Sequence, residues 1–138
     1  MDEDEARRRF AAGRVARLAT IDARGRPHLV PVVFVVDGGT IYSPVDDKPK
    51  RTRRLQRLRN LEGDPNATML VDHYDEDWPA VWWVRARGAG RLIAEDTDEY
   101  RRADALLTEK YPQYREDHES GPGIAIDVAD WLGWAYTE

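Results

Sequence analysis

The sequence contains no cysteine and no long apolar run. Without cysteine the chain can form no disulfide, no thiolate metal site and no cysteine nucleophile, so redox chemistry would need a borrowed cofactor. No apolar stretch approaches the ~18 residues that a membrane-spanning helix requires. Residues 1–5 are acidic where a secretory signal would be basic. We therefore expect a cytoplasmic protein that does not bind a membrane.

Motifs of several enzyme classes are also missing. The three histidines, His28, His73 and His118, lie far apart, and none has the spacing of a metal-ligand motif. There is no Gly-rich phosphate loop and no Gly-x-Ser-x-Gly elbow, which disfavours nucleotide-hydrolysing enzymes and serine hydrolases. The acidic residues Asp72 and 75–77 are typical of an exposed turn, so we expect no bound metal.

The remaining composition is that of one globular domain. The chain has 138 residues, of which 41% are hydrophobic and 34% are charged. This balance is too apolar for a disordered polyelectrolyte, and the length suits a single hydrophobic core. We therefore predict one domain that covers residues 1–138.

The first half of the chain predicts a short helix followed by antiparallel strands. Residues 4–12 favour a helix that Gly13 would end. β-Branched and apolar residues then favour three strands, over residues 14–21, 28–36 and 40–43. Turns this short join only antiparallel neighbours, so we predict a meander.

The second half predicts two helices and further strands. After Pro49, leucines at a spacing of three predict a helix over the basic segment, and apolar spacing predicts another that ends at Pro112. Strands are expected over 67–74, 80–94 and 124–128, and residues 131–136 form or extend a last one. Gly88 and Gly90 within a long strand indicate a bulge, as in a sheet that closes into a barrel. About six antiparallel strands with two or three helices define a small α+β barrel, which is mainly β.

A basic segment stands out in an otherwise acidic chain. The net charge is −5, yet seven basic residues lie between Lys48 and Arg59 without one acid. Lys48, Lys50 and Arg51 directly precede a predicted helix, whose N-terminal amides also attract anions, so this segment is a candidate phosphate site. The alternative for Arg53, Arg54, Arg57 and Arg59 is the solvated face of an amphipathic helix.

The tryptophans suggest a second surface that needs a partner. Trp82 and Trp83 are adjacent in a predicted strand, so their side chains must point to opposite faces. If one fills the core, the other faces a helix, a ligand or a second subunit; the alternative is that helices bury both. Trp131 and Trp134 pose the same question. Together they favour a homodimer whose interface is also a ligand groove.

Four sets of residues resemble a known family, the flavin- and deazaflavin-binding split β-barrels related to pyridoxamine 5′-phosphate oxidase. The similarity is strongest to the actinobacterial branch that depends on coenzyme F420. The sets are Leu18-Ala19-Thr20-Ile21 with Gly25-Arg26-Pro27-His28-Leu29 and Pro31-Val32, Ile41-Tyr42-Ser43 with Lys48-Pro49-Lys50, Asn60-Leu61 with Asp64-Pro65-Asn66-Ala67, and Trp131-Leu132-Gly133-Trp134. Asp75-Glu76-Asp77-Trp78, together with Trp82-Trp83-Val84-Arg85, resembles a hallmark of one subgroup.

The resemblance implies a six-stranded antiparallel split β-barrel with flanking helices. It also implies a homodimer with two interface clefts, each holding a planar tricyclic cofactor. In that arrangement His28, Pro31 and Val33 line the cofactor ring and Ser43 contacts it from a strand end. Lys48 and Lys50 bind its phosphate, and Arg51, Arg54 and Trp78 complete the cofactor-binding set. No match is found to the C-terminal arginine and histidine that hold pyridoxal phosphate in true pyridoxamine phosphate oxidases.

The leading function is that of an oxidoreductase that transfers a hydride between reduced coenzyme F420 and a small organic acceptor. In such chemistry the cofactor carries the hydride, so a missing acid–base motif is no objection. The spare arginines after Arg51 suit the longer anionic tail of F420. Within the same fold the alternative is an FMN-binding oxidoreductase or flavin carrier. Two further alternatives are a cofactor-storage protein and a nucleic-acid-binding barrel, the last disfavoured by the overall acidity.

Overall fold

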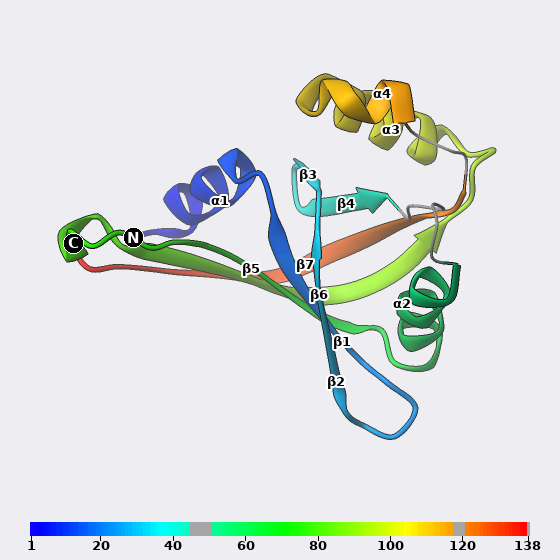
Figure 1. Ribbon diagram of the computed structural model, residues 1–138, viewed down its shortest axis with the longest axis horizontal. Coiled ribbons are helices and arrows are strands. Elements are labelled where there is room, and N and C mark those ends of the chain that lie inside the picture. Colours follow the sequence, from blue (N-terminus) through cyan, green and yellow to red (C-terminus); the bar gives the residue numbers. More distant parts are fainter. Residues whose placement is uncertain (45–50, 118–120, 138) are drawn as a thin grey trace.

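The computed structural model describes residues 1–44, 51–117 and 121–137, with the side chains of 51–55 and 115–117 also left undescribed (Figure 1). Its helices are α1 (Glu3–Ala12), α2 (Arg51–Gly63), α3 (Asp98–Lys110) and α4 (Pro112–Asp117), with one short 3-10 helix, η1 (Trp78–Ala80). Its strands are β1 (Ala16–Ile21), β2 (Pro27–Val32), β3 (Val35–Asp37), β4 (Thr40–Pro44), β5 (Asn66–His73), β6 (Trp82–Ile93) and β7 (Gly123–Ala135). The α+β prediction, mainly β, is confirmed.

The strands form one antiparallel sheet in the order β2-β1-β5-β6-β7-β4-β3. Its two edge strands, β2 and β3, are consecutive in the chain and are joined only by Val33 and Phe34. In a flat sheet of seven strands the edges would lie about 29 Å apart, because neighbouring strands are spaced at about 4.8 Å. The three residue steps from Val32 to Val35 reach about 11 Å at most. The sheet must therefore curl until its edges approach, which makes the split half-barrel seen in Figure 1.

Two details differ from the sequence prediction. The expected strand over 28–36 divides at Val33 and Phe34, so the sheet has seven strands instead of six. The predicted meander is wrong, since β2 pairs with β1 at one edge while β3 pairs with β4 at the other. Of the two possibilities left open for residues 131–136, extension of the preceding strand is confirmed, because β7 continues through to Ala135.

The predicted bulge is confirmed in β6. The register between β6 and β7 shifts between Arg87 and Gly88. A Cβ atom at Gly88 would lie 2.1 Å from the carbonyl oxygen of Asp127, so no side chain fits there. The bulge lets the long β6 bend with the curl of the sheet.

The core fills the concave inner face of the sheet, against α1 and α2. Phe10 of α1 is fully buried, with its ring centroid 5.0 Å from that of Phe34 and 5.3 Å from that of Trp131. Helix α1 begins where Asp2 accepts a hydrogen bond from the amide of Glu5, as expected of an N-cap. Leu61 of α2 packs so closely on β6 that a Cβ at Gly90 would meet it at 2.6 Å.

Helix α3 covers part of the outer face, near β4 and the start of β7. There Tyr42, Ile93, Ala103 and Ala125 form a second small core. Arg91 donates hydrogen bonds to both Glu99 and Asp127, and the Tyr42 hydroxyl donates to Glu99 at 2.8 Å. These bonds keep the pKa of the Glu99 carboxyl below its usual value. Helix α3 is thereby fixed over one end of the sheet, while none of the described helices covers the outer face of β1, β2 and β5 in Figure 1.

Candidate cofactor and ligand site

The link between β2 and β3 brings two predicted site residues together. The Ser43 hydroxyl donates a hydrogen bond of 2.8 Å to the carbonyl oxygen of Val33. Ser43 is buried, whereas Val33 is partly exposed beside the sheet edge. In this structure the Ser43 hydroxyl therefore fixes the link, and the Val33 side chain remains accessible.

Tyr111, at the end of α3, holds the same link from the other side. Its hydroxyl accepts from the amide of Phe34 at 3.2 Å and lies 2.9 Å from the Phe34 carbonyl and 3.0 Å from that of Arg14. The neighbouring Lys110 donates to the carbonyl of Ala11 at 3.1 Å, with its ammonium 3.9 Å from the Phe34 ring centre. The link is thus tied to α1, α3 and β4 at once.

Lys110 gives this cluster a pH dependence. Burial, and then the charge of Arg14, lowers the pKa of Lys110 from 10.5 to about 8. Between pH 8 and pH 10.5 the unfolded chain binds more protons at Lys110 than the folded chain does, so the contribution of Lys110 to the free energy of unfolding rises with pH. This contribution is complete above pH 10.5 and is lost as the pH falls through 8. We expect the free energy of unfolding of the wild type, minus that of Lys110→Met, to increase from pH 7 to pH 9.5 in urea titrations. A difference that is constant or falls over this range would contradict the assignment.

The predicted ring-lining residues lie on two faces of β2. His28 pairs with Thr20 of β1 on the inner side, and its Nδ1 atom is buried without a hydrogen-bond partner among the described residues. Pro31, three residues on, points to the outer face and is exposed. Because side chains alternate along a strand, His28 and Pro31 lie on opposite faces of β2. A single ligand can contact both of them only if it extends around the free edge of this strand.

The predicted phosphate site is only partly described. Lys48 and Lys50 lie outside the described residues, as do the side chains of Arg51 and Arg54. A helix follows Pro49 as predicted, but Arg51 is the first residue of α2 and does not precede it. Arg59 is exposed, in agreement with the solvated helix face expected there.

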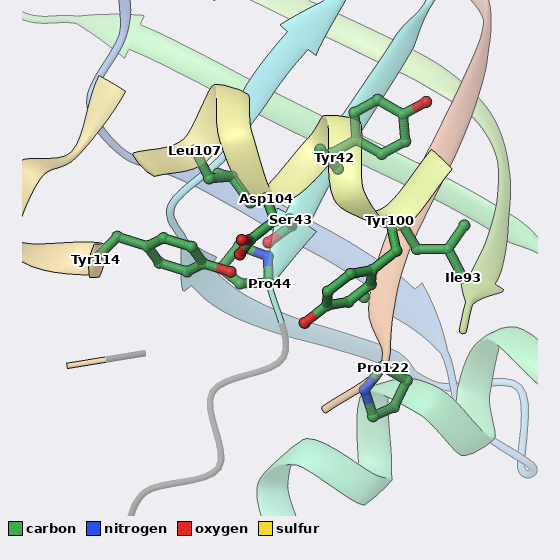
Figure 2. Close-up of a pocket in the computed structure, with 11 residues that line it drawn as sticks. Tyr42, Ser43, Pro44, Ile93, Tyr100, Asp104, Leu107, Tyr114 and Pro122 are labelled. Carbon is green, nitrogen blue, oxygen red and sulfur yellow. The ribbon is translucent and has the colours of Figure 1, made fainter. Parts of the chain in front are cut away.

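The pocket next to Ser43 is too small for a cofactor. Figure 2 shows it between α3, α4 and the end of β4, with Tyr100, Tyr114 and Asp104 among its walls. Its volume is about 10 Å³, which is enough for roughly one water molecule. Burial and the nearby Asp104 carboxylate raise the pKa of Tyr114. The pocket is therefore part of the packing of α3 and α4 and does not accommodate a tricyclic ring.

A much larger groove lies on the uncovered part of the outer face, which we call the outer groove. It has a volume of about 520 Å³, within the usual range for small-molecule sites. It is lined by Arg17, Ala19, Leu29, Thr68, Leu70, Asp72, Trp83 and Arg85. The strand register shows one straight row across the face, and this row runs through Pro31, Arg17, Leu70, Arg85 and Leu132. The row begins at Pro31, a predicted cofactor residue, and three of its members, Arg17, Leu70 and Arg85, line the outer groove.

The outer groove continues into an exposed apolar surface. Leu29, Leu132 and Trp134 are 65%, 46% and 41% exposed, and Trp83 lies opposite Trp134 in the register. The prediction that Trp82 and Trp83 point to opposite faces is confirmed, because Trp82 packs against the main core and Trp83 lines the outer groove. The positions of Arg85 and Leu132 beside the groove depend on strand pairing and could not be predicted from the sequence.

Trp78 lies far from Ser43 within one chain. It belongs to η1, between β5 and β6, and is 57% exposed. Figure 1 shows this segment beside both chain termini, at the opposite end of the long strands from the end of β4. Trp78 and Ser43, which were predicted for one cofactor site, are therefore not brought together by a single copy of the chain.

The chain belongs to the pyridoxamine 5′-phosphate oxidase family, whose sequence profile matches residues 2–135. No curated protein matches at a significant level.

Several solved structures share the fold. A conserved hypothetical protein from Mycobacterium tuberculosis is 23% identical, with a TM-score of 0.76 over 98% of this chain and 85% of its own. A FAD-binding protein from Mesorhizobium loti is 16% identical, with a TM-score of 0.74 over 96% and 94%. The heme storage protein HutZ from Vibrio cholerae is 16% identical, with a TM-score of 0.73 over 98% and 95%.

Neither a metal centre nor a membrane-spanning helix is found in the described part of the chain. No group of three or more histidine, aspartate and glutamate side chains in the described part of the chain is placed to hold a metal ion. No helix among those residues is long and apolar enough to cross a membrane.

Proposed function

We propose that the protein is an oxidoreductase that binds coenzyme F420 and transfers a hydride between the reduced deazaflavin and a small organic acceptor. The observation that carries the proposal is the outer groove, an uncovered apolar site of about 520 Å³ beside the exposed Pro31. In the family to which the chain belongs, a bound cofactor supplies the redox chemistry, and the protein binds and orients it. A cytoplasmic location is part of this proposal, and the absence of cysteine is compatible with it.

The proposed active form is a homodimer with two cofactor clefts at its interface. The apolar outer face supports this, because exposed contiguous apolar patches commonly mark interaction sites. The separation of Trp78 from Ser43 supports it as well. If both residues contact one cofactor, a two-fold axis would bring Trp78 of one copy to the Ser43 end of the other. In such a cleft Val33 and Pro31 would border the ring, while Lys48, Lys50, Arg51 and Arg54 would bind the anionic tail.

The specific alternative is an FMN-binding oxidoreductase or flavin carrier. The FAD-binding protein that shares the fold supports a flavin in general. We favour F420 because seven basic residues between Lys48 and Arg59 exceed what one phosphate needs, and the deazaflavin tail carries additional carboxylates. No observation specifically favours a nucleic-acid partner, since the outer groove is not lined by the basic segment.

Titration of coenzyme F420 and of FMN, followed by tryptophan quenching, tests the proposal. We expect F420 to bind more tightly than FMN. Lys50→Ala should weaken F420 binding by about 1.5–3 kcal/mol, the range for a lost charge-assisted hydrogen bond. Arg59→Ala is the matched control, because its exposed side chain lies at the other end of α2 and should matter little.

Two results would count against this assignment. A clear preference for FMN, or yellow flavin that co-purifies with the protein, would show that the cofactor is a flavin and not F420. The assignment of the fold would be unaffected. Equal F420 affinity of Lys50→Ala and Arg59→Ala would show that the phosphate is bound elsewhere.

A further inference from the structure

The turn between β3 and β4 contains a peptide bond of a type that can rearrange. Asp37 ends β3, and Gly38 and Gly39 form the turn that leads into β4. In the whole sequence Asp37 is the one aspartate or asparagine that glycine follows. Glycine has no Cβ atom that hinders its amide nitrogen, so an aspartyl-glycine bond closes to a cyclic imide more readily than other aspartyl bonds. The turn is therefore a candidate site of spontaneous backbone modification.

The surroundings of the turn leave room for this ring closure. Gly38 has a φ of +61°, and a Cβ atom placed on Gly38 or Gly39 would meet no other atom within 4 Å. The side chain of Asp37 is itself partly exposed. Packing therefore does not prevent the Asp37 carboxyl group from turning toward the amide nitrogen of Gly38.

The Asp37 carboxylate is instead held by Arg102 of α3. The Nε atom of Arg102 donates a hydrogen bond to Oδ2 of Asp37 at 2.6 Å, and its Nη2 atom donates to Oδ1 at 3.0 Å. Both carboxylate oxygens are thus fixed by one planar guanidinium. These hydrogen bonds also keep the pKa of the Asp37 carboxyl below its usual value. Arg102 therefore opposes ring closure in two ways, since an ionised carboxylate has no hydroxyl group that can leave as water.

We infer that Asp37 is a latent isoaspartate site and that Arg102 protects it. When the contact with Arg102 opens and the carboxyl takes up a proton, the amide nitrogen of Gly38 attacks Cγ of Asp37. The N–Cγ bond forms, and the amide proton leaves with the carboxyl hydroxyl as water. A second water molecule then opens the succinimide at the former main-chain carbonyl, which breaks the original C–N bond and leaves the chain running through Cβ and Cγ. No oxidant or cofactor takes part, so the inference does not depend on the proposed function.

The rearrangement would disconnect β3 from α3. It adds one methylene group to the main chain and leaves the carboxylate directly on Cα, where it cannot meet Arg102 in the same geometry. Asp37 pairs with Thr40 in the register of β3 and β4, and β3 has only three residues. Because β3 is an edge strand that directly follows the link at Val33 and Phe34, the modification would loosen this edge of the sheet.

Ageing of the purified protein in neutral buffer tests the inference. An isoaspartyl methyltransferase assay counts isoaspartate, and peptide mass spectrometry finds its position. We expect Arg102→Gln to accumulate isoaspartate at position 37 roughly fivefold faster than the wild type, the upper end of the effect of a surface ion pair. Arg101→Gln is the matched control and should age like the wild type, because it removes the neighbouring arginine, which pairs with Asp98 within α3. Asp37→Glu should give no signal at this position, since glutamate would have to close a larger ring.

A salt series on the wild type supplies a second measurement that needs no substitution. Salt screens a surface ion pair, so we expect the rate at position 37 to rise with salt in the wild type and to stay constant in Arg102→Gln. Equal rates in the wild type and in Arg102→Gln would overturn the inference. Isoaspartate that forms mainly at another aspartate would overturn it as well, as would a wild-type rate that does not respond to salt.

Discussion

Trp83→Glu is expected to dissociate the proposed homodimer into monomers of 15.9 kDa and to remove cofactor binding in the same protein. Trp83 lies on the uncovered outer face, opposite Trp134 in the strand register. A glutamate there would place an unpaired carboxylate in the proposed interface, at a cost of several kcal/mol, or about a thousandfold in dimer affinity. Light scattering measures the mass, and tryptophan quenching by F420 measures the binding.

The matched control is Leu92→Glu. Leu92 is an exposed leucine of the same strand, but it pairs with Ile124 at the other end of β6, away from the outer groove. We expect this variant to remain a dimer that binds the cofactor. A Trp83→Glu monomer that binds the cofactor with full affinity would refute the shared cleft.

Phe34→Ala is expected to lower the free energy of unfolding by roughly 3–5 kcal/mol, the usual cost of removing a buried phenylalanine. Phe34 is fully buried, contacts Phe10, and supplies the ring over which Lys110 lies. It is also one of only two residues that join the edges of the sheet. Urea denaturation measures the loss. The control is Val15→Ala, at an exposed position, which should change the free energy of unfolding by less than about 0.5 kcal/mol. An equally small effect of Phe34→Ala would contradict the role of Phe34 in holding the link between β2 and β3.

The sequence predicts those elements whose signals are local. Short Gly-containing turns correctly predicted the hairpins β1–β2 and β3–β4, and Gly88 correctly predicted a bulge. The break at Val33 could not be predicted, because residues 32–36 form a continuous apolar run that is equally compatible with one strand. Only the closure of the whole sheet requires the chain to pass from one edge to the other at that point.

The site was predictable to a lesser degree, because its contacts join distant residues. Tyr111 fits the apolar spacing of a helix, and nothing local indicates that its hydroxyl reaches Phe34, 77 residues earlier. Arg85 belongs to a motif that the resemblance singled out, yet its isolation between Leu70 and Leu132 follows only from the register of three strands. Which strand residues lie side by side is a property of the pairing, and the pairing is set by the complete core.

The position of β7 has a consequence for synthesis of the protein. Among the described strands, β7 alone joins β6 to β4, and α1 also packs against it. On the ribosome, β2-β1-β5-β6 and β4-β3 therefore cannot join into one sheet until residues 123–135 have been made. The aromatic core around Phe10 also lacks Trp131 until then. The barrel thus closes only after β7 has been made, and a nascent chain that stalls before residue 123 exposes the unpaired edges of both β6 and β4.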